Sequence, residues 1–196
     1  MGHSFGSFVS QGFIEEYGND IDACILCGTA GPRPALITVG SIAAHVITFF
    51  TGKNKCLKLM DQLSFGSYNA RVENPKTPFD WLSKNELNVE MYKMDNWCGI
   101  PLTASFFCSM VEGLNKIHKS SNIKKIPVTL PVFFIYGSED PVGSYGKTVK
   151  ALADIYKNNG LKSVELKEYP GDRHEILNEN DKEQVENDII NWISKV

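Results

Sequence analysis

The sequence lacks any long run of lysine and arginine, and its formal net charge is −3. Proteins whose main partner is nucleic acid or an anionic membrane carry such clusters. No basic segment followed by an apolar stretch marks a secretory signal. The longest apolar run, residues 35–50, includes His45 and is shorter than the roughly 20 residues of a membrane-spanning helix, so it predicts a buried helix or part of a lid. We expect a cytoplasmic protein without a nucleic-acid partner or an integral membrane segment.

Cysteines are few and odd in number, five in the whole chain, whereas a disulfide framework needs an even set. Only Cys24 and Cys27 have C-x-x-C spacing, and no second pair completes a zinc site. Positions three apart on a strand face opposite sides of the sheet, so these two thiols would not converge. We therefore expect buried free thiols in a reducing compartment, no metal and no cofactor.

What is present is the pattern of a folded α/β domain. The 196 residues suffice for one hydrophobic core, and 42% of them are hydrophobic. Short apolar runs alternate with amphipathic segments, which is typical of a parallel sheet with right-handed crossovers. The pattern predicts strands at 22–28, 132–136 and 163–171, the last nearer the sheet edge, and helices at 5–17, 144–159 and 181–196.

Details of the helices can also be predicted. Ser83 and Glu86 are three residues apart, which is typical of a capped helix start. The first and last helices each have an apolar side. The residues predicted on these two sides are Phe8, Val9, Gly12 and Phe13, and Val185, Ile189, Trp192 and Ile193.

The chain begins with GHSFG, a Gly-X-Ser-X-Gly pattern. In enzymes this pattern forms the turn between a buried strand and a helix, and the serine adopts a strained backbone. Close packing of helix and strand is then expected to exclude side chains at Gly2 and Gly6. No segment of strand length precedes the pattern, so a chance match is the alternative to a catalytic Ser4.

Two further polar residues follow predicted strands: Asp140 comes after PVFFIYG, and His174 comes after SVELKEY. The carboxyl ends of parallel strands lie at one edge, where working residues gather. A serine needs a base, which histidine supplies near neutral pH, and a carboxylate fixes the imidazole tautomer. A helix cap at Asp140 and a surface histidine at His174 are the plainer interpretations, but their joint placement with Ser4 favours a triad. Asp140 is predicted over Glu139, because adjacent residues leaving a strand point in different directions.

At these motifs the chain resembles a known family. The segments GHSFGS, CGTAG, YGSEDPVG and DRHEILNE resemble signature segments of α/β-hydrolases of the serine aminopeptidase, lysophospholipase and monoacylglycerol lipase group. The segment FDWLSKNE…CGIPLTASF resembles the lid of bacterial lysophospholipase-like members. The resemblance covers nearly the whole chain. It implies Ser4 as nucleophile, Asp140 as acid, His174 as base and the Phe5 amide as an oxyanion donor.

The resemblance also implies an organisation: the C-terminal part of an α/β-hydrolase fold, with core segments at 1–31 and 127–196 and a helical lid at 32–126. Family members have strands and helices before the serine turn that this sequence lacks, and Met1 is expected to be an internal position of the fold. The second oxyanion donor comes from a loop after an early strand, and no residue can be assigned to it. We expect the chain by itself to have little ester turnover and to self-associate through an exposed sheet edge.

Three functions remain open. The first is a serine hydrolase that forms an acyl-enzyme with a small acyl ester such as a monoacylglycerol or lysophospholipid. Apolar lid residues suit an acyl chain, although most of them are expected to fill the lid's own core: Phe49, Phe50, Phe106, Phe107 and Met110. The second is an aminopeptidase, which needs a lid carboxylate for the substrate amine. The unranked candidates are Asp61, Glu73, Asp80, Glu86, Glu90 and Asp95. The third is a non-catalytic C-terminal fragment or one half of a split protein.

Overall fold

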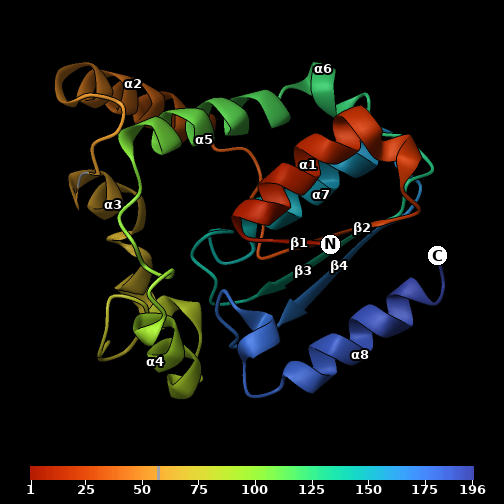
Figure 1. Ribbon diagram of the computed structural model, residues 1–196. Coiled ribbons are helices and arrows are strands. Elements are labelled where there is room, and N and C mark those ends of the chain that lie inside the picture. The colour runs from red at the N-terminus through yellow and green to blue at the C-terminus, as the bar shows by residue number, and fades with distance from the viewer. Residues whose placement is uncertain (57) are drawn as a thin grey trace.

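A parallel sheet forms the centre of the molecule (Figure 1). The computed structural model describes residues 1–56 and 58–196. In this part of the chain the sheet has the strand order β1-β2-β3-β4, and all neighbours are parallel. The strands are β1 (Gly2–His3), β2 (Cys24–Cys27), β3 (Val132–Gly137) and β4 (Val164–Tyr169). Strand β2 pairs with β3, with Leu26 opposite Phe134, and the predicted α/β fold class is confirmed.

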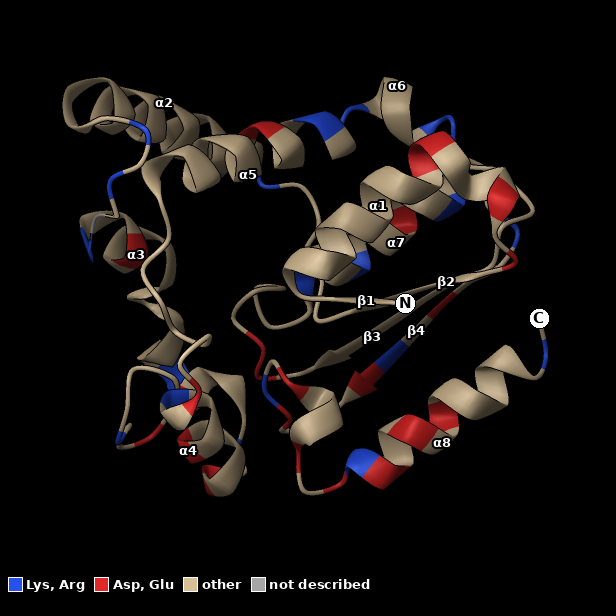
Figure 2. Cartoon of the chain, in the orientation of Figure 1, with Lys and Arg blue, Asp and Glu red and all other residues tan. Residues whose placement is uncertain are grey.

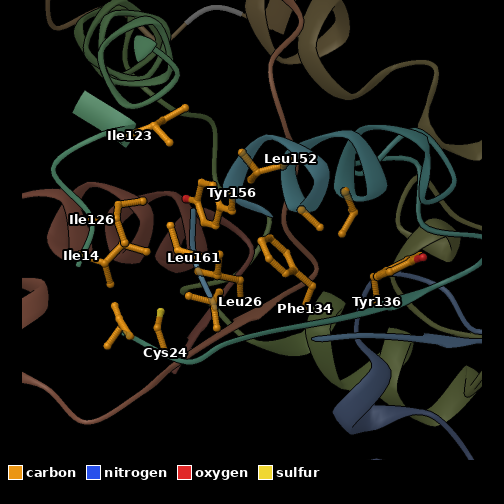
Figure 3. Close-up of a cluster of buried hydrophobic side chains, with 14 residues drawn as sticks. Ile14, Cys24, Leu26, Ile123, Ile126, Phe134, Tyr136, Leu152, Tyr156 and Leu161 are labelled. Carbon is orange, nitrogen blue, oxygen red and sulfur yellow. The ribbon is translucent and has the colours of Figure 1, made fainter. Parts of the chain in front are cut away.

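Helices cover both faces of this sheet. Helices α1 (Phe5–Tyr17) and α7 (Lys147–Asn158) overlie one face, and α8 (Lys182–Ile193) lies on the other (Figure 1). Alternate strand residues enter two separate cores, and Figure 3 shows the one beneath α1 and α7. Cys24 faces this core, whereas Cys27 faces the core beneath α8. The prediction that the two thiols point to opposite faces is confirmed.

The connection between β2 and β3, which we call the insertion (residues 32–126), is mostly helical and lies largely to one side of the sheet (Figure 1). Helix α2 has no charged residue (Figure 2), yet Phe49 and Phe50 near its end are 83% and 79% exposed. The interpretation of residues 35–50 as a buried helix is therefore wrong, and they form an outer part of the insertion. Among residues 1–56 and 58–196, every helix is either too short or too polar to span a bilayer. The helices are α2 (Pro34–Thr51), α3 (Lys58–Phe65), α4 (Glu86–Met94), α5 (Ala104–Ile117) and α6 (Ser120–Ile123), with 3-10 turns η2 (Tyr68–Arg71) and η3 (Asp80–Leu82).

Helix α1 turns its polar side inward. Ser7 and Gln11 are completely buried, whereas Val9 and Phe13 are 58% and 43% exposed. Both buried side chains lie 2.8 Å from the hydroxyl oxygen of Thr29, just after β2. The apolar side predicted from the sequence is therefore not the buried side. The polar side can be buried because Thr29, distant in the sequence, forms hydrogen bonds with Ser7 and Gln11.

Two helices begin later than predicted. Asn85 caps α4, because its side chain accepts from the Leu87 N–H (3.1 Å), whereas the Ser83 hydroxyl bonds elsewhere. Helix α7 begins only at Lys147, because Ser144 and Tyr145 have φ values of 51° and 58°, which no right-handed helix accommodates.

The final helix α8 has nearly the predicted apolar side. Val185 and Trp192 are buried against the sheet, and Ile189 packs partly against the same core. Ile193 is 52% exposed, so its predicted place on this side is wrong. The helix ends at this residue, whereas Trp192 in the same turn stacks on Phe133 of β3 with ring centroids 5.1 Å apart.

Candidate active site

Ser4 occupies the turn between β1 and α1 with φ 53° and ψ −122°. This backbone region is costly for a residue with a side chain and is typical of functional turns. The Ser4 N–H donates to the Cys27 carbonyl (3.0 Å), and the Ser4 carbonyl accepts from the Ser7 hydroxyl (2.5 Å). The strand-turn-helix context that the motif requires is therefore present, and neighbouring groups hold the strained serine.

The two glycines of the motif have different surroundings. A Cβ atom on Gly2 would collide with the carbonyl oxygen of Gly6 and the hydroxyl of Ser10. A Cβ atom on Gly6 would meet nothing within 4 Å in the described structure, apart from its chain neighbours and its own helix backbone. The expectation that close packing excludes a side chain holds for Gly2 and is wrong for Gly6.

His174 connects Ser4 with Asp140. It is 2% exposed and lies between β4 and the 3-10 turn η4 (Ile176–Asn178). Its Nε2 lies 2.8 Å from Ser4 Oγ, and its Nδ1 lies 3.0 Å from Asp140 Oδ2. An ionised carboxylate only accepts hydrogen bonds, so Nδ1 carries the proton and Nε2 accepts from the serine hydroxyl. The structure brings the three side chains together at the carboxyl edge of the sheet.

Asp140 follows β3 and is completely buried. Its Oδ1 accepts from the Val142 N–H at 2.8 Å, which leaves Oδ2 for His174. The neighbouring Glu139 has an exposed side chain. The contact with the imidazole therefore comes from Asp140 and not from Glu139.

The imidazole of His174 contacts two other rings. Its centroid lies 4.7 Å from that of His3 and 5.1 Å from that of Trp81. The His3 Nε2–H donates to the His174 carbonyl at 3.1 Å. Burial and the neighbouring His174 ring lower the pKa of His3 below its usual value. A Cβ atom on Gly28, whose φ is 54°, would lie 3.1 Å from His174 Cε1, so these neighbours leave the imidazole little room to turn.

Phe5 contributes both its backbone and its ring. The first N–H groups of a helix have no acceptor within the helix, and no hydrogen bond of the described residues uses the Phe5 N–H at the start of α1. This donor is therefore available next to Ser4. The Phe5 ring packs against Phe106 of α5 with centroids 5.2 Å apart, which brings the insertion against the serine turn.

Most of the apolar residues proposed for acyl binding have another role. Phe107 and Met110 belong to the insertion's own core, around Ala44 and Met60, and the two phenylalanines near the end of α2 are exposed. Phe106 differs, because it contacts the residue that follows Ser4.

Two surface cavities, of about 170 and 280 Å³, lie along the insertion. Charged residues such as Glu73, Lys84 and Arg173 line both of them. Neither cavity is lined by Ser4 or His174. The candidate site is therefore defined by the triad geometry and not by these cavities.

The cysteines are free thiols. Burial raises the pKa of Cys24 to about 11 and that of Cys27 further, so both stay protonated and unreactive at neutral pH. Cys56 is exposed, and Cys98 and Cys108 are only partly buried, so the expectation of buried thiols holds for Cys24 and Cys27 and is wrong for the other three. Within residues 1–56 and 58–196, no group of three or more His, Cys, Asp or Glu is arranged to hold a metal ion.

The sequence analysis missed several residues around the triad: His3, Gly28, Trp81 and Glu179. Only Gly28 has a local signal in the sequence, because it is a glycine that ends an apolar run. In the structure it has a positive φ, which favours glycine. His3 and its acceptor are 171 positions apart, and Glu179 and one of its donors are 96 apart. Contacts over such distances leave no periodic pattern in the sequence.

One family model and several solved structures match this chain. A family model described as serine aminopeptidase, S33, matches residues 1–181. A thermostable carboxyl esterase from Bacillus coagulans has a similar structure, with a TM-score of 0.91 and 30% identity over 100% of this chain and 63% of that one. Similar folds occur in a monoacylglycerol lipase from Paleococcus ferrophilus (TM-score 0.70, 18% identity, 97% of this chain and 65% of that chain) and a monoglyceride lipase from Saccharomyces cerevisiae (0.65, 20%, 99% and 63%). The chain thus spans less than two thirds of the length of each.

Proposed function

Because the chain belongs to the serine aminopeptidase (S33) family of α/β-hydrolases, we propose that it hydrolyses carboxylic esters with Ser4 as nucleophile, His174 as base and Asp140 as acid. One observation carries the proposal: Ser4 Oγ lies 2.8 Å from His174 Nε2, and this serine has a φ of 53°. A serine in a strained turn, next to a histidine bonded to a buried carboxylate, has the arrangement of an activated nucleophile.

In this mechanism Ser4 Oγ attacks the ester carbonyl carbon while its proton passes to His174 Nε2. The carbonyl oxygen becomes an oxyanion that accepts from the Phe5 N–H. The C–O bond to the alcohol then breaks, the alcohol leaves with the proton from His174, and the acyl group remains on Ser4. Water then attacks the acyl carbon and gives a proton to His174 Nε2, the bond between the acyl carbon and Ser4 Oγ breaks, and His174 returns the proton to Ser4 Oγ as the acid leaves. Asp140 stabilises the imidazolium that forms in each half of the cycle.

We propose a small acyl ester of the monoacylglycerol or lysophospholipid kind as the substrate. The contact between Phe5 and Phe106 supports this choice, because it provides apolar surface beside the oxyanion donor. The similarity to a carboxyl esterase and to monoacylglycerol lipases agrees with it. In this proposal residues 32–126 serve as the lid, and residues 1–31 and 127–196 form the core.

An aminopeptidase is the second candidate, because the family description includes that activity. Such an enzyme needs a free carboxylate for the substrate amine. Several of the carboxylates predicted for this purpose already have partners: Glu86 and Glu90 pair with lysines, and Asp80 accepts from the N–H of Thr77. Asp95 likewise accepts from the Trp97 N–H at 2.8 Å, and the two remaining candidates are Asp61 and Glu73. Ester hydrolysis therefore stands first.

We further propose that the 196-residue chain by itself turns over esters slowly. Within the described residues the Phe5 N–H is the one donor that we assign to the oxyanion, and loss of a donor costs about 3 kcal/mol, or roughly 100-fold in rate. A non-catalytic fragment would instead leave Ser4 unreactive. The free thiols suit a reducing compartment such as the cytoplasm. The proposed mechanism needs no cofactor, because it uses only side chains and backbone groups of the protein.

Labelling with a fluorophosphonate, which reacts with activated serines, tests the proposal. We expect mass spectrometry to find the adduct on Ser4, and the matched variant Ser4→Ala to stay unlabelled. A folded chain that is not labelled, or equal labelling of Ser4→Ala, would contradict the proposed function. A series of p-nitrophenyl esters compared with aminoacyl anilides then separates the two activities, and faster anilide cleavage would favour the aminopeptidase.

A further inference from the structure

The loop that carries His174 is bonded to one short part of the insertion, residues 80–84, which we call the bridging segment. The backbones of the two segments run side by side, and Figure 1 shows the loop after β4 near α4. The His174 N–H donates to the Trp81 carbonyl (3.4 Å), and the Glu175 N–H donates to the Leu82 carbonyl (2.7 Å). The histidine and the residue after it therefore depend on the bridging segment for their backbone hydrogen bonds.

Charged side chains strengthen this connection in both directions. The Arg173 guanidinium donates to the carbonyl oxygens of Asp80 (2.7 Å) and Ser83 (3.0 Å). In return, Lys84 Nζ lies 2.7 Å from Asp172 Oδ1, and the Asp172 side chain is completely buried. Each of the two residues before His174 thus contacts the bridging segment through its side chain.

Glu179 lies at the centre of these contacts. It is 1% exposed, and it forms no ion pair in the described structure. Its carboxylate accepts from the Arg173 N–H (3.0 Å), the Ser83 hydroxyl (3.0 Å) and the Lys84 N–H (3.0 Å). The first donor directly precedes His174, and the other two belong to the bridging segment. One buried carboxylate therefore joins both segments, and charge-assisted hydrogen bonds of this kind are strong.

The joined segments bring an aromatic ring against the imidazole. The Trp81 ring lies 5.1 Å from that of His174, and its other neighbour is Tyr68 at 4.8 Å. The Trp81 N–H donates to the Asn69 side chain (2.8 Å), which fixes the tryptophan from the insertion side. The position of the imidazole relative to Ser4 thus depends on contacts outside the triad.

We propose that Glu179 is a positioning residue for His174: its carboxylate holds the bridging segment to the histidine loop and so keeps Trp81 against the imidazole. This inference rests on the proposed function, in which His174 is the base. Small displacements of a base cost large factors in rate. The bridging segment is therefore a fixed part of the site, although it belongs to the insertion.

Glu179→Gln tests the proposal, because the amide keeps the shape but replaces one of the two acceptor oxygens with an NH2 group, which cannot accept from the donors that reach it. We expect the rate of fluorophosphonate labelling at Ser4 to fall about tenfold or more. We also expect the downfield NMR resonance of the His174 Nδ1 proton, which reports the bond to Asp140, to broaden or disappear. Near-ultraviolet circular dichroism checks that the variant is folded. A folded Glu179→Gln with the wild-type rate and resonance would overturn the proposal.

Trp192→Phe is the matched control. It removes the hydrogen bond from Trp192 Nε1 to the Glu165 carboxylate (3.0 Å), which lies at the opposite end of β4 from the triad. We expect a lower thermal midpoint with an unchanged labelling rate and resonance, and an equal loss of the resonance in this control would overturn the proposal.

Ser83→Ala replaces Glu179→Gln if the latter does not fold, because it keeps the carboxylate and removes one donor. We then expect fluorophosphonate labelling of Ser4 to be roughly threefold slower, because one hydrogen bond contributes about 0.5–1.5 kcal/mol, and the His174 Nδ1 proton resonance to broaden. A folded Ser83→Ala with the wild-type labelling rate and resonance would overturn the proposal. If the wild-type chain is not labelled by the fluorophosphonate, that result counts against the proposed function alone. The His174 Nδ1 proton resonance is measured without the fluorophosphonate. Comparing it between the wild type and the variants therefore still tests whether Glu179 positions His174.

Discussion

Asp140 Oδ2 lies 3.0 Å from His174 Nδ1, whereas the side chain of the adjacent Glu139 is exposed. Asp140→Asn is expected to slow labelling of Ser4 by roughly 10³- to 10⁴-fold, because the amide favours the wrong imidazole tautomer. Glu139→Gln serves as control and should label at the wild-type rate. The proposed roles would be wrong if Asp140→Asn labelled normally, or if the control lost as much as the variant.

The glycines of the GHSFG motif give a matched pair for stability. Gly2→Ala places a methyl group against the Gly6 carbonyl and the Ser10 hydroxyl, and such overpacking costs about 1–3 kcal/mol. Gly6→Ala meets open space in the described structure, and alanine suits the first turn of a helix better than glycine by a few tenths to about 1 kcal/mol. Urea unfolding measures both, and equal destabilisation by the two variants would contradict this account.

Glu15 provides a pH-dependent prediction. It is 4% exposed on the buried side of α1, and burial raises its pKa from 4.5 to about 8. The folded protein therefore binds this proton more tightly than the unfolded chain, so the stability contribution is complete below pH 4.5 and is lost as the pH rises to 8. Glu15→Gln removes the titration and should raise the free energy of unfolding at pH 8 by about 2 kcal/mol or more.

The gain from Glu15→Gln should shrink when unfolding is measured at pH 5. Glu16→Gln is the control, because Glu16 is an exposed neighbour that pairs with Lys125 at 2.7 Å, and it should give no gain at either pH. A Glu15→Gln variant whose stability ran parallel to that of the wild type between pH 5 and pH 8 would show that this carboxyl group titrates normally.

The strands, and the meeting of the Ser4, Asp140 and His174 side chains, could be predicted because their signals are local. An apolar run that ends at a glycine marks each buried strand, and the polar residues after Gly137 and Tyr169 must then lie at one edge of a parallel sheet. The known chemistry of serine, histidine and carboxylate then selected Ser4, Asp140 and His174 from the polar residues at this edge, and their catalytic roles stay a prediction. These inferences needed no knowledge of which surfaces touch.

Other features could not be predicted because they depend on partners distant in the sequence. Helix α1 presents an apolar stripe, but Gln11 is buried because Thr29 lies beneath it. Ser83 looked like a helix cap, but its hydroxyl bonds Glu179, 96 positions later. A polar residue finds its acceptor only when the chain is folded, so local periodicity assigns it to the surface or to a cap.

Helix α1 and strand β1 together leave an apolar surface open. Among the described residues β1 pairs with β2 alone, so the backbone groups on its other side have no strand partner. The stripe beside it, repeated at every fourth position of α1, consists of Phe5, Val9, Phe13 and Tyr17, which are 45%, 58%, 43% and 56% exposed. An open edge next to exposed apolar side chains favours pairing with a second copy of the chain.

We expect the chain to self-associate at micromolar concentration, and a charge placed on this stripe should prevent it. The double variant Val9→Lys and Phe13→Lys should shift the mass measured by light scattering during size-exclusion chromatography toward that of a monomer, because buried lysines would oppose the contact. The matched control is Leu87→Lys with Met91→Lys, which changes two residues of α4 that are 75% and 69% exposed with the same spacing, and its mass should stay that of the wild type. A monomeric wild-type chain would refute self-association, and an equal effect of the control would show that the contact lies elsewhere.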